Sequence, residues 1–244
     1  MIKIFQYICS FLGVKKILYT FLLILIHQNS SYAHEINKNE IELIVKNFLL
    51  KNPEFIKSTL DNYQFKLAKE KKKGAINLLK EIKNPGIFQK NADITIFEFF
   101  DYNCGYCKSV TKMIMNLLSE DKKINFVFVE FPILSQQSYK AALAALASKK
   151  QGLYNDFHLS LMNIRGRIDE DKIFETAKNI GLNIDKLKND MLNPSIQNIL
   201  DKNREVAKRL GLNGTPAFII GDIIYPGAIK KSGLQEIIYN YRKN

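Results

Sequence analysis

The chain has 244 residues, a length that suits one domain with an appendage or two small domains. Its 46% hydrophobic residues, 12 Gly and 6 Pro exclude a collagenous or low-complexity protein, and 3 Cys are too few for a disulfide-stapled scaffold. The formal net charge is +12, but without a nucleic-acid-binding motif we attribute it to a lysine-rich composition and expect no nucleic-acid partner.

Residues 1–33 have the features of an export signal. Lys15 and Lys16 precede the apolar run Ile17–Ile26, and small residues lead to a cleavage site after Ala33. We expect cleavage there and a periplasmic protein; an uncleaved segment would instead anchor the chain in the membrane. The mature chain then keeps two cysteines, three positions apart, in a compartment that permits disulfides.

Residues 34–88 are predicted to form an N-terminal helical segment. Apolar residues recur at helical spacing in the stretches 41–49, 56–67 and 76–82, and Pro53 separates the first two. So short a segment cannot bury these stripes alone. It can pack on the domain that follows or on copies of itself, and we expect the second arrangement, a homo-oligomer.

From residue 94 the pattern changes to that of an α/β domain. The expected order is a buried strand at 94–100, a helix from 104, a second buried strand at 124–131, helices through 138–210, a hairpin at 217–225 and a last helix at 231–242. The fold class expected from the pattern is therefore α/β.

The chemistry is expected at Cys104-Gly105-Tyr106-Cys107, where the first strand gives way to a helix. Cys104 at the helix N-terminus faces unpaired backbone N–H groups and the positive end of the helix dipole, which favour its thiolate. We therefore expect a lowered pKa and attack on disulfides. Cys107 lies one turn further on, so it can close a bond with Cys104 and expel a bound thiol.

Three other interpretations of the cysteine pair are possible. A zinc site normally takes four ligands, and the mature chain adds only His34 and His158. A purely structural disulfide would close a very short loop and stabilise little. A chance pair is disfavoured by export and by the position between strand and helix. We therefore expect a redox pair and no metal.

A second motif, Gly214-Thr215-Pro216-Ala217, precedes the hairpin. A proline directly before a strand removes a backbone hydrogen-bond donor, so its presence there suggests a structural or functional role. A cis bond before Pro216 would be a deliberate feature that leaves the backbone of Thr215 free to pair with an extended substrate. The alternative is an ordinary turn proline.

With these motifs in place, the chain resembles the DsbA family of exported thiol–disulfide oxidoreductases, which have the thioredoxin fold. The matching segments are FEFFDYNCGYCK at 97–108, EFPIL at 130–134 and GTPA at 214–217. The resemblance covers about residues 90–244 and implies a thioredoxin-like domain at 89–244, with 138–210 as the family's helical insertion. The motifs are most similar to ScsC-like members, some of which carry an N-terminal oligomerisation segment.

The resemblance implies roles for individual residues. Cys104 is expected to be the nucleophile and Cys107 the resolving thiol of a Cys104–Cys107 disulfide. Thr215 and Pro216 are expected to form the substrate-facing loop.

The resemblance also matches Glu98 to a family position, a carboxylate beneath the active site. It is either a buried proton relay to Cys107 or a solvated residue at the sheet edge, and we expect the relay. Gly105 and Tyr106, also expected to face substrate, replace the family's usual Pro-His, which argues against strong oxidant behaviour.

The function expected is the formation or reshuffling of disulfide bonds in cysteine-containing exported proteins, without a cofactor, with a membrane redox partner that resets the pair. A redox-active copper-handling or binding protein of the cell envelope is the alternative, because two thiolates also form a soft-metal ligand set. Pro216 beside the sulfurs favours peptide binding over a metal. An envelope protein with an inert oxidised pair is the third possibility.

Overall fold

The computed structural model describes residues 37–243. The expected signal peptide and its cleavage site lie outside the described residues. The chain divides into two compact units, residues 1–62 and 63–244. Within the described part of the chain, no helix combines the length and apolar character that crossing a membrane requires.

The described part of the first unit is helical. Helix α2 (Lys38–Lys51) begins at Asn37, whose side chain accepts a hydrogen bond from the backbone N–H of Glu40 at 3.0 Å. Helix α3 (Pro53–Glu81) follows and continues into the second unit. The expected break at the proline is therefore present, but the second and third apolar stretches belong to one helix. No residue of α2 is buried.

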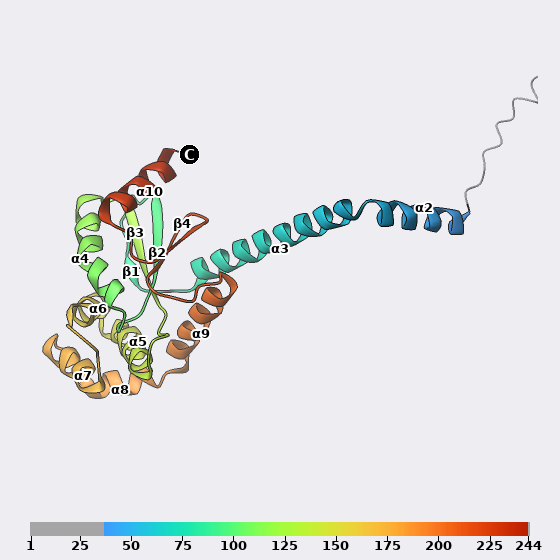
Figure 1. Ribbon diagram of the computed structural model, residues 1–244. Helices are drawn as coiled ribbons and strands as arrows, with labels where there is room; N and C mark the ends of the chain where they lie inside the picture. Colours follow the sequence, from blue (N-terminus) through green and yellow to red (C-terminus); the bar gives the residue numbers. More distant parts are fainter. Residues whose placement is uncertain (1–36, 244) are drawn as a thin grey trace, which may run out of the picture. The chain divides into compact units, whose positions relative to one another are not determined.

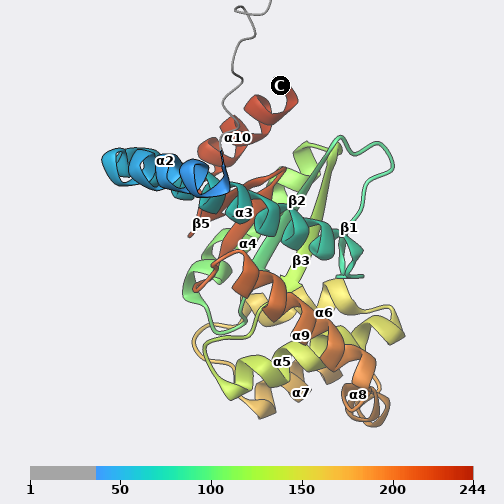
Figure 2. The same ribbon diagram turned by 90° about the vertical axis from the view of Figure 1, so that its right-hand side faces the viewer.

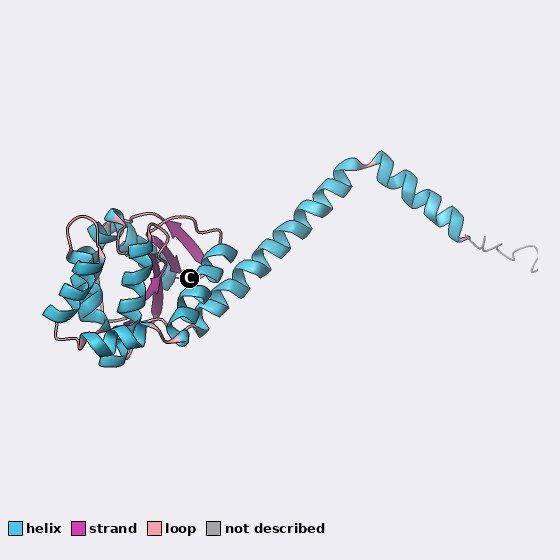
Figure 3. Ribbon diagram, turned by 90° about the horizontal axis from the view of Figure 1, so that it is seen from below, coloured by secondary structure: helices cyan, strands magenta, loops and turns pink. Residues whose placement is uncertain are grey.

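The second unit is built on a five-stranded sheet in the order β1-β3-β2-β4-β5. The central pair, β2 and β3, is parallel, and the other pairs are antiparallel. The strands are β1 (Gly86–Ile87), β2 (Ile94–Phe100), β3 (Ile124–Glu130), β4 (Ala217–Ile220) and β5 (Ile223–Pro226). Figure 3 shows these strands in magenta with helices packed around them.

The helices of this unit connect and cover the strands. They are α4 (Gly105–Glu120), α5 (Gln136–Ser148), α6 (Tyr154–Asn163), α7 (Glu170–Asn179), α8 (Ile184–Met191), α9 (Pro194–Arg209) and α10 (Lys231–Lys243). A parallel β2–α4–β3 connection places α4 against the sheet, and the block α5–α9 is inserted between β3 and β4. Figure 1 shows α5–α8 grouped at one end of the sheet. This is the thioredoxin-like fold with a helical insertion.

The alternation of side chains along the strands divides the core into two layers. Ile96 and Phe100 of β2 pack with α4, α10 and the inserted helices, whereas Phe97 and Phe99 pack with α9 and the end of α3. Figure 2 shows α9 and the end of α3 in front of the sheet. Glu98 shares the parity of Ile96 and Phe100, so it faces the layer that contains the cysteines.

The expected strands, hairpin and helices are confirmed, with boundaries that differ by one or two residues. Strand β1 was missed. Its two residues are too few to show a period, so the sequence predicts no strand at 86–87. In the structure Gly86 lies against β3, where an added Cβ would overlap the carbonyl of Phe126, so only glycine permits this approach.

Candidate active site

Both cysteines lie where β2 gives way to α4. Cys104 is the N-cap of α4, with φ −81° and ψ 112°, and its sulfur accepts a hydrogen bond from the backbone N–H of Cys107 at 3.2 Å. Cys104 is 5% exposed and Cys107 is fully buried, and both are free thiols in this structure. The pair is therefore placed asymmetrically, with one sulfur near the surface and one beneath it.

The surroundings of Cys104 favour its thiolate. A hydrogen bond with the Cys107 thiol is the largest cause, and the Thr215 side chain and the backbone N–H groups of Tyr106 and Cys107 add to it. Together they lower the pKa of Cys104 to about 6, although burial opposes the shift. Near neutral pH most of this sulfur is in the nucleophilic form.

The opposite holds for Cys107. Burial is the largest cause that raises its pKa, followed by its hydrogen bond with Cys104 and the nearby charges of Glu98 and Cys104. Cys107 therefore keeps its proton while Cys104 is charged. This division of labour matches an attacking thiolate and a resolving thiol.

Glu98 is buried beneath the cysteines rather than solvated at the sheet edge. It is 2% exposed, and its Oε1 atom has no hydrogen-bond partner among the described residues. Burial and, secondarily, the charge of Cys104 raise the pKa of Glu98 to about 8. A carboxyl group in this state holds a proton near neutral pH and can release it at modest cost.

The Thr215–Pro216 peptide bond is cis, which is the first of the two possibilities that the sequence leaves open. The loop lies beside the cysteines, because the Cys104 thiol donates a hydrogen bond to the Thr215 carbonyl at 3.3 Å. A cavity of about 290 Å³ is lined by the loop from Leu210 to Ala217 and by the end of β5. The structure thus brings together two motifs that are 111 positions apart in sequence.

The two residues between the cysteines face outward. Tyr106 is 72% exposed, and a Cβ added at Gly105 would meet no atom within 4 Å. The surface at this point is therefore open to an approaching chain, with an aromatic ring available for contact.

Asp101 is a residue of the site that the sequence did not single out. One carboxylate oxygen accepts a hydrogen bond from the backbone N–H of Asn103 at 2.7 Å. The other accepts from the N–H groups of Ile133 and Leu134, each at 2.9 Å. Asp101 therefore fixes the segment after β3 beside the cysteine motif, where Ile133 and Leu134 remain partly exposed.

A buried polar cluster beneath the active-site segment was also missed. Glu130 accepts hydrogen bonds from the hydroxyls of Tyr102 at 2.9 Å and Tyr154 at 2.8 Å, and the Tyr102 oxygen lies 3.1 Å from Nδ1 of His158. Burial is the largest cause that raises the pKa of Glu130, and it lowers that of His158 to about 3. The cluster ties the end of β3 to α6 and to the residue two positions before Cys104.

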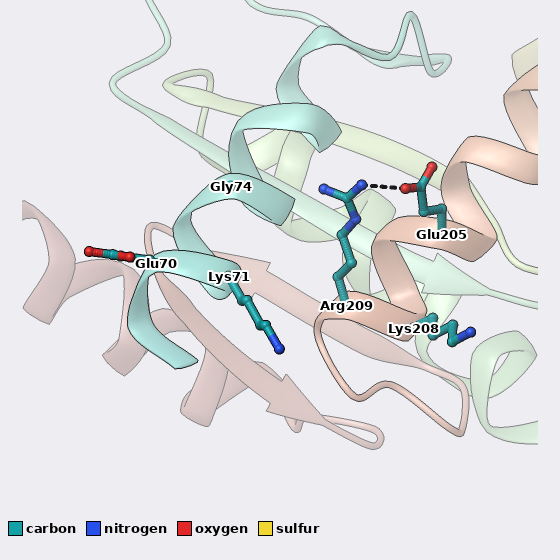
Figure 4. Close-up of a pocket in the computed structure, with 6 residues that line it drawn as sticks. All are labelled: Glu70, Lys71, Gly74, Glu205, Lys208 and Arg209. Atoms are coloured by element: carbon teal, nitrogen blue, oxygen red, sulfur yellow. Dashed lines mark hydrogen bonds and ion pairs between the residues drawn. The ribbon is translucent and has the colours of Figure 1, made fainter. Parts of the chain in front are cut away.

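A second groove of this unit is lined by charged residues and a glycine rather than by the cysteines. It measures about 760 Å³ and lies between α3 and α9, lined by Glu70, Lys71, Gly74, Glu205, Lys208 and Arg209. Figure 4 shows Arg209 directed toward Glu205, with which it forms an ion pair along α9.

Comparison with protein families gives one matching model, described as a DSBA-like thioredoxin domain, over residues 95–238. This range is more than half of the chain and contains the cysteine pair, the cis-proline loop and the helical insertion.

Solved structures agree with this match. A thioredoxin-like oxidoreductase from Silicibacter pomeroyi DSS-3 is 36% identical, with 66% of this chain and 92% of that chain covered and a TM-score of 0.64. The thiol-disulfide exchange protein alpha-DsbA2 from Wolbachia pipientis is 28% identical, with 73% and 97% covered and a TM-score of 0.66. The catalytic domain of Proteus mirabilis ScsC is 26% identical, with 72% and 99% covered and a TM-score of 0.65.

Curated relatives include a longer protein. The Na(+)/H(+) antiporter NhaA 3 from Salinispora tropica is 22% identical over 133 residues, which are 54% of this chain and 20% of the antiporter. The chain thus spans about a fifth of the length of the curated relatives that it matches.

Proposed function

The chain belongs to the family of DSBA-like thioredoxin domains, and from that premise we propose that it forms or reshuffles disulfide bonds in exported proteins. It is a thiol–disulfide oxidoreductase with a Cys104–Cys107 pair. The observation that carries the proposal is the asymmetry of this pair. Cys104 has a pKa near 6 at the start of α4, whereas burial raises the pKa of Cys107.

The proposed reaction passes through a mixed disulfide with a client, meaning a protein on whose cysteines the pair acts. The Cys104 thiolate attacks one sulfur of a client disulfide, the client S–S bond breaks, and the other client sulfur leaves as a thiolate. Cys107 then loses its proton and attacks the Cys104 sulfur, which releases the second client thiolate. The client gains two electrons and the pair loses two; the reverse sequence oxidises a client dithiol.

Isomerisation uses the first step alone. The client thiolate that was released attacks a different sulfur of the same client, and a later client thiolate displaces Cys104. No net electron transfer occurs, so the pair ends as it began.

We assign Glu98 to proton transfer at Cys107. The resolving thiol must lose its proton when it attacks, in a buried place where water is scarce. A carboxyl group with a pKa of about 8 is partly deprotonated near neutral pH, and more so once the mixed disulfide has removed the charge of Cys104. The deprotonated form accepts the proton that Cys107 loses. The absence of a hydrogen-bond partner for Oε1 among the described residues supports this role.

We assign Thr215, Pro216, Gly105 and Tyr106 to client binding. The cis-proline loop contacts Cys104, and Tyr106, two positions after Cys104, is exposed. An extended client segment placed between them would have backbone groups of Thr215 and an aromatic ring within reach.

Catalysed refolding tests the proposal. A protein whose native state contains several disulfides is reduced and denatured. It is then refolded in a glutathione buffer with catalytic amounts of the chain. The wild-type chain is expected to accelerate the recovery of native disulfides, and Cys104→Ser is expected to abolish the acceleration. A wild-type chain that leaves the rate unchanged would overturn the proposed function.

Export is part of the proposal. Residues 1–33 would direct the chain to the periplasm and be removed, residues 34–88 would form a helical segment, and residues 89–244 would carry the activity. A membrane redox partner would reset the pair after each net oxidation or reduction of a client.

We propose further that the helical segment makes the protein a homo-oligomer. Apolar side chains of α2 are largely exposed, with Ile44 at 58% and Phe48 at 49%. Phe48 packs against Phe55 across the break between the helices, with ring centroids 5.6 Å apart. By contrast, Ile76 and Leu79 at the end of α3 are buried against the sheet of the second unit. The exposed stripe is an apolar surface of the kind that a second copy of the chain can cover.

Light scattering on residues 34–244 tests the oligomer. The mature chain is expected to be oligomeric, and Ile44→Glu/Phe48→Glu is expected to be monomeric, because two charges would be buried without partners. A monomeric wild-type chain would refute the oligomer. It would also remove the main reason to favour reshuffling over one-step oxidation, since several Cys104 sites around one client suit repeated exchange.

A further inference from the structure

The loop between α6 and α7, residues 164–168, is attached to the active-site helix by a lysine. Lys108, directly after Cys107, donates hydrogen bonds from Nζ to the carbonyl oxygens of Ile164 at 2.9 Å and Gly166 at 2.7 Å. A second lysine, Lys172 of α7, donates to the Arg167 carbonyl at 2.8 Å. The carbonyl groups of this loop are thus turned toward lysine side chains.

The other end of the loop is attached to the residue directly before Cys104. The Asn103 side-chain oxygen accepts a hydrogen bond from the Ile168 N–H at 2.7 Å, and Ile168 itself is 2% exposed. The Asn103 side-chain nitrogen donates to the hydroxyls of Ser135 and Ser138 at 3.1 Å. Residues on both sides of the cysteine pair therefore hold the loop beside it.

The two arginines of this loop, Arg165 and Arg167, are exposed. Among the described residues, neither Arg165 nor Arg167 uses its side chain in a hydrogen bond or ion pair. Of the acidic residues that follow at the start of α7, Asp169 pairs with Lys172 and Glu170 with Lys140. Asp171 is exposed and adds one negative charge nearby. The two guanidinium groups are thus available to an external carboxylate.

We propose that loop 164–168 is a second wall of the client-binding surface, on which Arg165 and Arg167 bind acidic residues that flank the client's reacting cysteine. This inference rests on the proposed function and names a client class for it. Guanidinium groups bind carboxylates in a planar, two-point geometry, and exposed charges act mainly on the rate of encounter.

Three short peptides test the inference, each with two cysteines and with flanking residues that are acidic, neutral or basic. The oxidised chain transfers its disulfide to each peptide: the peptide loses two electrons and Cys104 and Cys107 become thiols. The selectivity is the rate constant for the acidic peptide divided by that for the basic one. This ratio is compared between variants on the same peptides, so intrinsic differences in peptide reactivity cancel.

Arg165→Glu/Arg167→Glu is expected to lower the selectivity about 10-fold at low salt, with a smaller effect at high salt. Lys186→Glu/Lys202→Glu, exposed on α8 and α9, changes the net charge equally and is expected to keep the wild-type ratio. Arg165→Lys/Arg167→Lys keeps the charge and is expected to retain most of the selectivity.

Equal selectivity in the arginine reversal and in the lysine control would overturn the inference while leaving the proposed function intact. A wild-type chain that oxidises none of the three peptides, the neutral one included, would contradict the proposed function and the inference with it.

Discussion

Replacing Glu98 with glutamine is expected to stabilise the fold progressively as the pH rises. Burial raises the pKa of Glu98 from 4.5 to about 8 in the folded chain, so the unfolded chain releases this proton first. Between these values the unfolded state binds fewer protons, and the wild-type free energy of unfolding falls with increasing pH. Glutamine does not titrate, so the variant escapes this loss.

The size of the effect follows from the interval between the two pKa values. An interval of 3.5 pH units at 1.36 kcal/mol each gives a relative stabilisation of at most about 5 kcal/mol above pH 8. The measurement uses oxidised protein, in which Cys104 carries no charge and burial, the largest cause, acts alone.

Urea unfolding followed by circular dichroism at about pH 5, 7 and 9 provides the test. Glu236→Gln, at an exposed position of α10, is the matched control for the change of residue type. The cost of burying the glutamine amide is the same at every pH, so it does not affect how the difference in free energy of unfolding varies with pH. If the difference between Glu98→Gln and wild type stayed flat from pH 5 to 9, the buried, protonated carboxyl group would be refuted.

Two further predictions concern the thiolate and the buried cluster. The ultraviolet absorbance of the Cys104 thiolate is expected to titrate with a midpoint of about 6, against about 8.5 for a free thiol, and an unshifted midpoint would remove the basis for its reactivity. Tyr154→Phe removes one of two donors to buried Glu130 and is expected to lower the free energy of unfolding by about 1–3 kcal/mol. Tyr239→Phe, at a 60% exposed position, is the control, and equal effects of the two changes would contradict the cluster's structural role.

Much of the fold is accessible from local sequence patterns. The central strands are continuous apolar runs, which is typical of strands buried on both faces. The helices of the insertion show a clear period and begin at Asp169, Asn183 and Asn193, whose side chains accept the first backbone N–H groups. Strand β1 has no such signal, because its two residues are defined only by pairing with β3.

The candidate site likewise contains residues that the sequence reveals and residues that it does not. Cys104 and Cys107 are visible because their spacing and position carry the chemistry, and the parity of β2 places Glu98 on the cysteine face. Asp101, Asn103 and Lys108 act through hydrogen bonds to backbone groups 32 to 65 positions away. No local pattern encodes such bonds, so these residues remain inconspicuous until the loops are placed beside the cysteines.

Trapping the mixed disulfide tests the central claim most directly. Cys107→Ser protein, incubated with a client that contains a disulfide, is expected to accumulate a covalent complex linked through Cys104, because the resolving thiol is absent. Cys104→Ser is expected to yield no complex, since the fully buried Cys107 keeps its proton. Mass spectrometry of the crosslinked peptides identifies the sulfur involved. A complex linked through Cys107, or equal trapping by both variants, would contradict the assignment of Cys104 as the nucleophile.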